Sequence, residues 1–286
     1  MSVDILQEKI RKCKNPSVLE LNLPLSDLPP QFEKTPEGYR EFCCQILSGL
    51  KGIVPAVRFS FAAFALNGAL ETLIGAMAFA AEQGYYVLLD VPEILSPAMA
   101  KLTAETLLGE GSSYSCDGLV ISGYLGSDVI KPFLPYCKKQ QKDIFVVART
   151  ANKSAPELQD LLSGTRLVHA AAADHVNRYG ADTAGKFGYT RVGIVAAASA
   201  AESLRNLRAK YPKLLLLLDG YDYANANAKN CSFAFDKYGH GAVVCSGNGI
   251  TCAWKQAESA GEDWLEQAKA AAERMKKNLT RYVTVL

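Results

Sequence analysis

The segment YYVLLDV (residues 85–91) decides the fold of this chain, because it is a short apolar run that ends in a carboxylate. Tyrosine, valine and leucine favour a strand, and no polar residue interrupts the run before Asp90. A continuous run, rather than an alternating one, is typical of a parallel strand that is covered on both faces. The residues therefore predict a buried parallel strand that places Asp90 at its carboxyl end.

Seven other short apolar runs repeat this pattern, and longer segments of helical period separate them. The runs are SVLELNL (17–23), IVPAVRF (53–59), GLVIS (118–122), DIFVVA (143–148), VGIVAAA (192–198), KLLLLLD (213–219) and GAVVCS (241–246). Eight strand–helix repeats in 286 residues predict a (β/α)8 TIM barrel of the α/β class. A doubly wound open sheet is the alternative, but no Gly-x-Gly-x-x-Gly follows the first run.

Two local features refine this architecture. The apolar segment 61–84 carries Asn67, Gly68 and Glu71, so it predicts a buried helix rather than a membrane span. Ser199 followed by Glu202 resembles a capping box that opens a helix. No linker of low complexity divides the chain, so we expect one barrel domain over residues 1–286.

Composition narrows the classes of function. The formal net charge of +2 gives no reason to expect nucleic acid as a partner, and no membrane association is expected. The eight cysteines are scattered without a Cys-x-x-Cys pair, and the chain has three histidines. A zinc site or a disulfide framework is therefore not expected, and a reducing cytoplasm fits best. The charged, amphipathic first residues do not predict a signal peptide.

In a barrel of this kind the functional residues lie where the strands end at their carboxyl side. The polar residues at these positions are Asn22, Arg58, Asp90 to Glu93, Ser122, Arg149 and Thr150, Ser199, Asp219 to Asp222, and Ser246 to Asn248. As a set they predict a small-molecule pocket. His169 and His175 fall on a predicted helix, and we expect them at the surface or at the edge of the core.

Several segments carry a resemblance to a known family in order, spacing and identity. They are VPAVRFSFAAFALNG (54–68), GYLGSDVIKPFLPYCKK (123–139), FVVARTANKSAPELQDLL (145–162), AAASAAESLRNLR (196–208) and FDKYGHGAVVCSGNGITCAW (235–254). Through them the chain resembles orotidine 5'-monophosphate decarboxylase, in particular its longer bacterial subfamily. The resemblance implies a barrel, a dimer, and a decarboxylation in pyrimidine biosynthesis that needs no cofactor and no metal.

The family's chemistry depends on a Lys-Asp-Lys-Asp array that opposes the substrate carboxylate and protonates the product carbanion. The resemblance places the first lysine at Arg58, a cation that does not readily move a proton. Asp90 keeps the first aspartate, Pro92 replaces the proton-donating lysine, and Leu95 replaces the second aspartate. Arg58 and Asp90 are thus the remaining candidate catalytic residues. Leu95 also removes a carboxylate that family dimers extend to the neighbouring subunit.

The substrate-binding positions that the resemblance implies are altered as well. Residues 219–226 replace a glycine-rich phosphate loop with a segment that contains Asp219 and Asp222, and Ala224 replaces its glutamine. Asn248 stands where the family has a phosphate-binding arginine. The candidate substrate-binding residues are Asn22, Thr150, Asn152, Gly220, Gly247 and Asn248.

Three hypotheses follow. The first is a homologue that is inactive towards orotidine monophosphate and is retained for binding a pyrimidine nucleotide or other small molecule, for regulation, or for partnership as a homodimer or with an active paralogue. The second is a different enzyme in which Arg58, Asp90, Glu93, Arg149, Asp219 and Asp222 converge, with carboxylates that could hold Mg²⁺. Against it, Glu93 and Asp222 are expected as solvated loop charges, and Asp90 as the partner of Arg58 in a structural pair. The third is residual decarboxylation with Lys101 or Lys153 as a substitute proton donor.

Overall fold

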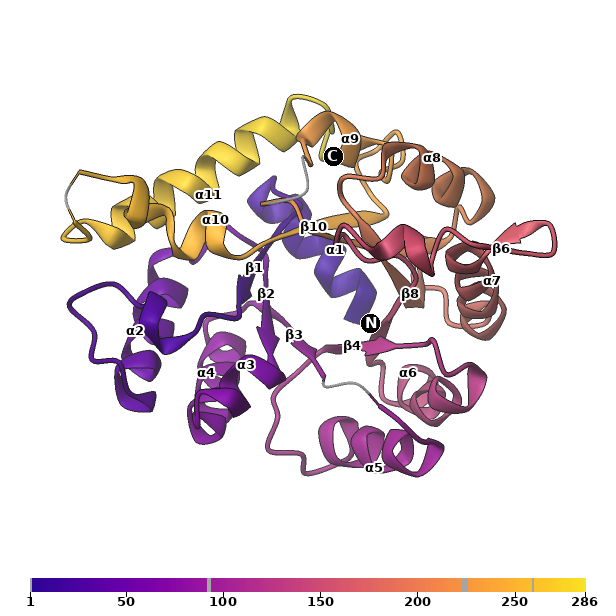
Figure 1. Cartoon of the computed structure of the whole chain (residues 1–286), viewed down its shortest axis with the longest axis horizontal. Coiled ribbons are helices and arrows are strands. Elements are labelled where there is room, and N and C mark those ends of the chain that lie inside the picture. Colours follow the sequence, from indigo (N-terminus) through magenta and orange to yellow (C-terminus); the bar gives the residue numbers. More distant parts are fainter. Residues whose placement is uncertain (1, 92–93, 223–225, 259) are drawn as a thin grey trace.

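Eight parallel strands close into a barrel in the computed structural model, which describes residues 2–91, 94–222, 226–258 and 260–286 (Figure 1). The strands are β1 (Ser17–Leu21), β2 (Ala56–Ser60), β3 (Tyr86–Asp90), β4 (Gly118–Ser122), β5 (Asp143–Val147), β8 (Thr190–Ala197), β9 (Leu214–Asp219) and β10 (Ala242–Ser246). Neighbours in the barrel follow the chain order, and β1 pairs with both β2 and β10 to close it. The (β/α)8 prediction is confirmed.

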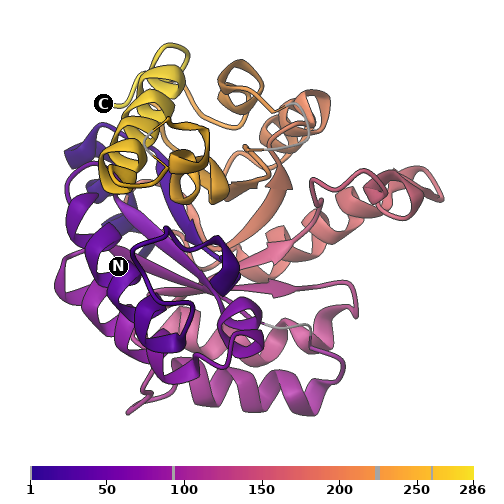
Figure 2. The same ribbon diagram turned by 60° about the vertical axis from the view of Figure 1, so that its left-hand side comes forward.

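Helices surround the barrel on its outer side (Figure 2). They are α2 (Pro36–Gly49), α3 (Phe61–Leu66), α4 (Leu70–Glu82), α5 (Pro97–Leu108), α6 (Leu134–Lys139), α7 (Val168–Gly180), α8 (Ala201–Lys210), α9 (Ala228–Ser232), α10 (Asn248–Thr251) and α11 (Trp264–Thr280). Short 3₁₀ turns η1 (Leu25–Asp27), η2 (Ser127–Val129), η3 (Lys131–Phe133), η4 (Ala155–Glu157) and η5 (Ala253–Gln256) connect them. Trp264 closes the ring of helices, because its ring lies 5.1 Å from that of Phe42 on α2.

The barrel interior and the layer under the helices are two separate cores, as the period of two along each strand requires. On β1, Val18 faces the interior, whereas Leu19 and Leu21 face the helices. Helix α1 (Ser2–Cys13) packs Leu6 and Ile10 against the interior core, and it lies across the end of the barrel where the strands begin (Figure 1). The opposite end, where the strands finish, is left for polar side chains.

Two local predictions were wrong. Segment 61–84 is not one helix: Asn67 and Gly68 separate α3 from α4, because the Asn67 amide binds the backbone of Leu23 and Leu25 and Gly68 has a φ of +66°. The Ser199 capping box does not form either. Helix α8 begins one residue later than that box requires, with Ala200 at its N-cap and no side chain that caps it.

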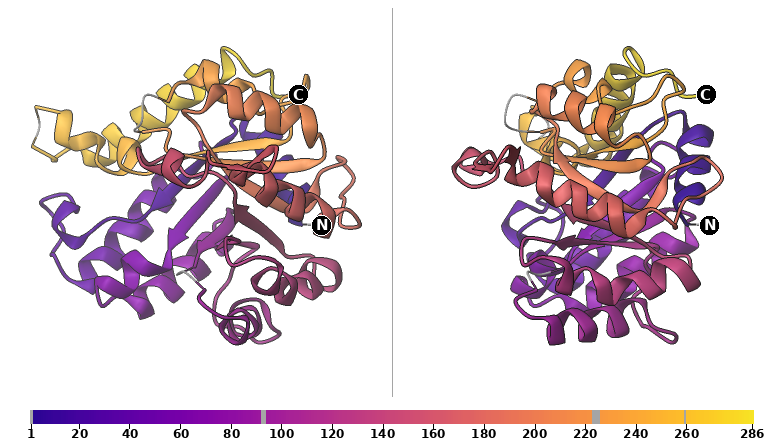
Figure 3. Two further views of the ribbon diagram at one scale, coloured as in Figure 1. Left: turned by 45° about the vertical axis from the view of Figure 1, so that its right-hand side comes forward. Right: turned by 90° about the vertical axis from the view of Figure 1, so that its right-hand side faces the viewer.

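A short hairpin, β6 (Leu162–Ser163) and β7 (Arg166–Leu167), projects beyond the barrel between β5 and α7 (Figure 3). Among the described residues, no helix is both long and apolar enough to cross a membrane.

Candidate functional site

One buried guanidinium occupies the end of the barrel where the strands finish. Alternation along the strands turns Glu20, Arg58, Asp90 and Asp219 inward, and Glu20 is the register partner of Arg58 across β1 and β2. Arg58 Nη2 lies 2.6 Å from Asp90 Oδ2, and Nη1 lies 3.4 Å from Asp219 Oδ1 and 3.5 Å from Glu20 Oε1. We call these four residues the Arg58 centre. The expected Arg58–Asp90 pair is present.

The Arg58 centre carries more negative than positive charge, and burial makes that imbalance costly. Arg58 is 5% exposed. Burial raises the pKa of Glu20 to about 7. The positive charge of Arg58 opposes this rise, and the negative charges of Asp219 and Asp90 add to it. Burial also raises the pKa of Asp90, although Arg58 opposes it. Burial alone would lower the pKa of Arg58, but the surrounding carboxylates raise it well above its usual range. Glu20 therefore exchanges its proton near neutral pH.

Glu20 is the member of the centre that the sequence analysis did not select. The resemblance aligns the segment Glu20–Leu23 with a Gly-Leu-Asp-Pro pattern, so a glutamate stands where the family has a glycine. That substitution adds a carboxylate to the barrel interior. This replacement of a glycine by a glutamate was the signal in the sequence that could have identified Glu20.

The Asp222 carboxylate accepts hydrogen bonds from residues at the end of β10. Its Oδ1 accepts a hydrogen bond from Ser246 Oγ at 2.6 Å, and its Oδ2 accepts bonds from the amides of Gly247 at 2.6 Å and Gly249 at 3.1 Å. Asp222 is exposed, as expected for a loop charge, but these three donors also hold its carboxylate in place. A Cβ on Gly249 would lie 2.3 Å from Asp222 Oδ1, so the approach requires glycine there.

The candidate substrate-binding residues separate into two groups. Near the Arg58 centre, Asn22 lies beside Gly247, and the amide of Gly220 donates to Asp219 Oδ1 at 2.9 Å. On the loop after β5, Thr150 donates to Asn152 Oδ1 and its backbone amide binds Gln159 Oε1, so these two residues belong to a separate polar cluster.

Asn248 is exposed at the start of α10. Pro92, Glu93 and Ala224, which the sequence analysis singled out, lie outside the described residues.

Arg149 does not join the Arg58 centre, which corrects the expected convergence. It forms a two-pronged ion pair with Asp160, with Nε at 3.0 Å from Oδ1 and Nη2 at 2.8 Å from Oδ2. Lys101 lies on the surface of α5 and pairs with Glu105 at 3.7 Å, and Lys153 is exposed on its loop. Neither lysine contacts the Arg58 centre.

Metal binding at the strand ends finds no support in the part of the chain that the structure describes. No group of three or more histidine, cysteine, aspartate or glutamate side chains among those residues is placed to hold a metal ion. The carboxylates of the Arg58 centre are instead directed at the guanidinium.

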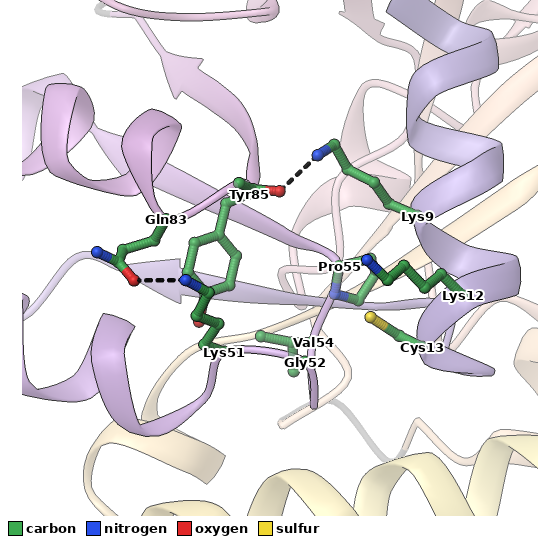
Figure 4. A pocket seen from close by; sticks show the side chains of 10 residues that line it. Lys9, Lys12, Cys13, Lys51, Gly52, Val54, Pro55, Gln83 and Tyr85 are labelled. Atoms are coloured by element: carbon green, nitrogen blue, oxygen red, sulfur yellow. Dashed lines mark hydrogen bonds between the residues drawn. The ribbon is translucent and has the colours of Figure 1, made fainter.

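A separate hollow of about 310 Å³ lies at the other end of the barrel, where β2 and β3 begin (Figure 4). Lys9, Lys12 and Lys51 line it, but Lys9 donates to the Gly84 carbonyl and Lys51 to Gln83 Oε1 at 3.0 Å. Two of the three cations are thus already bound by the protein, and the hollow is remote from the strand ends.

Comparisons with known proteins identify the family. The chain is 30% identical to an orotidine 5'-phosphate decarboxylase of Rhodopirellula baltica, over 93% of this chain and 92% of that protein. It is 26% identical to an orotidine 5'-phosphate decarboxylase of Clostridium novyi, over 98% of each chain. A crystal structure of a candidate orotidine monophosphate decarboxylase from Toxoplasma gondii shares the fold, with a TM-score of 0.80 and 23% identity over 98% of this chain and 97% of that one. No family model matches the sequence. On this similarity, the chain belongs to the orotidine 5'-phosphate decarboxylase family.

Proposed function

We propose that this chain does not decarboxylate orotidine 5'-monophosphate and is retained in its family for binding, regulation or partnership. The observation that supports this proposal most is the Arg58 centre. A buried guanidinium with three carboxylates stands where the family resemblance implies lysines that alternate with aspartates. A guanidinium stays protonated at physiological pH, so it is a poor donor of the proton that the product carbon must receive.

The loops at which the family resemblance implies phosphate binding support the same proposal. The amides of Gly247 and Gly249 and the hydroxyl of Ser246 already donate to the Asp222 carboxylate. A substrate phosphate at this position would compete with that carboxylate for its donors. It would also meet a like charge, which costs about 1–4 kcal/mol per pair at 4 Å.

One observation favours a second candidate function, a different reaction in the same barrel. With a pKa of about 7, Glu20 is suited to give or take a proton at neutral pH, next to Asp90 and Asp219. A strongly shifted carboxyl at the strand ends of a barrel is a candidate general acid. In that case Arg58 would bind an anionic group of the substrate, and Glu20 would be the group that transfers the proton.

The proposal is tested by a paired experiment on the purified chain. Orotidine monophosphate is supplied at high enzyme concentration and its loss is followed by absorbance, while uridine monophosphate is titrated by calorimetry in the same buffer. We expect no turnover above that of buffer. Turnover that disappears in Asp90→Ala would overturn the proposal and establish residual decarboxylation. Binding without turnover identifies a nucleotide-binding role, and neither binding nor turnover directs the search to protein partners.

We also propose that the chain forms a homodimer or pairs with an active paralogue through the face beside β2, β3 and β4. Large apolar side chains are exposed there: Leu66 at 88%, Leu95 at 72%, Met99 at 48%, Leu102 at 53% and Leu125 at 53%. They follow neighbouring strands of the barrel. An apolar face of this kind is typical of a surface that a second chain covers.

A cytoplasmic location is proposed as well, because all eight cysteines are free thiols.

A further inference from the structure

A serine, a histidine and an aspartate line up in a pocket outside the Arg58 centre. His169, the second residue of α7, places Nε2 at 3.3 Å from Ser203 Oγ, and its Nδ1 at 3.0 Å from Asp160 Oδ1. His169 is 5% exposed, so of the two expected places it takes the edge of the core and not the surface. The pocket has a volume of about 430 Å³, within the range of small-molecule sites, and all three residues line it.

The hydrogen bonds of His169 fix its tautomer. Nδ1 lies 3.0 Å from the carbonyl oxygen of Gln159 as well as 3.0 Å from Asp160 Oδ1, and both of these atoms are acceptors. The proton of a neutral imidazole must therefore reside on Nδ1. Nε2 is left as an acceptor, so the Ser203 hydroxyl donates to it. This is the orientation in which a histidine can remove a proton from a serine.

Asp160 is held as an ionised and oriented carboxylate. Arg149 contacts both of its oxygens, which fixes the plane of the carboxylate as well as its charge. The hydrogen bond from Arg149 lowers the pKa of Asp160 below its usual value. The arginine that was expected at the Arg58 centre thus acts here as a positioning residue for Asp160.

The start of α8 adds donors next to the serine. In an α-helix the first amides have no acceptor within the helix, and the N-cap residue Ala200 has no side-chain group to bind them. The backbone amides of Glu202 and Ser203 therefore have no acceptor within the ten-residue helix, and Ser203 belongs to the same first turn. Amides in this position can stabilise a negative oxygen that develops on a bound carbonyl group.

We propose that Ser203, His169 and Asp160 form a second active site that hydrolyses small carboxylic esters. Ser203 Oγ attacks the carbonyl carbon while its proton passes to His169 Nε2. The bond from carbon to the alcohol oxygen then breaks, and the alcohol leaves with that proton. Water attacks the acyl-serine in the same way, which releases the carboxylic acid and restores Ser203. Ser203 and His169 are the catalytic residues of this step, and Asp160 orients His169.

The test uses the full chain, a fluorophosphonate probe and p-nitrophenyl acetate. Mass spectrometry of the probe-treated protein is expected to find the adduct on Ser203, and ester hydrolysis is expected to fall to background in Ser203→Ala. Ser48→Ala is the matched control, because Ser48 is an exposed serine whose hydroxyl binds the Cys44 carbonyl at 2.8 Å rather than a histidine. This variant is expected to keep both labelling and hydrolysis.

His169→Gln tests the transfer of the proton. It is expected to slow the labelling of Ser203 by at least about 100-fold, as the loss of a general base does. Thermal unfolding by circular dichroism verifies that the variant is folded, and the Ser203→Ala result is decisive if it is not. Absence of an adduct on Ser203 in the wild type, equal hydrolysis by Ser203→Ala, or undiminished labelling in folded His169→Gln would each overturn the proposal.

Discussion

Replacing Glu20 by glutamine is expected to stabilise the protein at alkaline pH and to leave it unchanged at acidic pH. Glutamine resembles the protonated acid in size and charge, so the variant removes the cost of ionising a buried carboxyl group. The pKa of Glu20 rises from 4.5 to about 7 on folding, and each unit corresponds to about 1.4 kcal/mol. The full difference is therefore ~3 kcal/mol.

The sign of the pH dependence follows from which state binds the proton more tightly. Because the pKa is raised in the folded state, the contribution of Glu20 is fully present below pH 4.5 and is lost as the pH rises through about 7. The free energy of unfolding of Glu20→Gln should then be close to that of the wild type at pH 4.5, exceed it by about 1 kcal/mol at pH 5.5 and exceed it by about 3 kcal/mol at pH 8.

Urea unfolding followed by circular dichroism at these three pH values measures the difference. Glu110→Gln is the matched control, because it makes the same chemical change at an exposed position after α5 and should show no such trend. A difference that is equal at all three pH values, or a variant less stable than the wild type at pH 8, would refute the electrostatic account of the Arg58 centre.

The other predictions concern the same site and its surroundings. Arg58→Met should lower the free energy of unfolding at pH 7 by about 3–5 kcal/mol, since it leaves buried carboxylates without their cation; a loss below about 1 kcal/mol by urea unfolding would contradict this. Asp222→Ala should cost about 1–3 kcal/mol, because three donors lose their acceptor; unchanged stability would show that the carboxylate does not hold the loop. Leu102→Glu should convert a dimer to a monomer in sedimentation velocity, because it charges the exposed apolar face; a variant that sediments as the wild type does would exclude this face.

The barrel could be predicted because each strand carries its signal locally. Continuous apolar runs such as 85–91 and 213–219 are long enough for one strand each, and both became barrel strands. Details that depend on a single side chain were harder to predict. The break between α3 and α4 comes from the bonds of Asn67 to the η1 region, which no helical period reveals.

The candidate site was predictable in part. The carboxyl ends of the apolar runs and the family resemblance together placed Arg58, Asp90 and Asp219 at the strand ends, where they meet. The partner of Arg149 was not predictable, because Asp160 is reached through the conformation of an irregular loop. The same holds for His169 and Ser203, which are 34 residues apart and meet between the first turns of α7 and α8.

The most direct test of the central claim is release of labelled carbon dioxide from carboxyl-labelled orotidine monophosphate, with the purified chain in excess over substrate. Single-turnover conditions reveal a slow reaction that steady-state assays miss. The account predicts release at the rate of buffer alone, in the wild type and in Arg58→Met alike. Release above the rate of buffer that needs the wild-type chain would contradict it, and loss of that release in folded Arg58→Met would place the guanidinium in the decarboxylation that we infer to be absent.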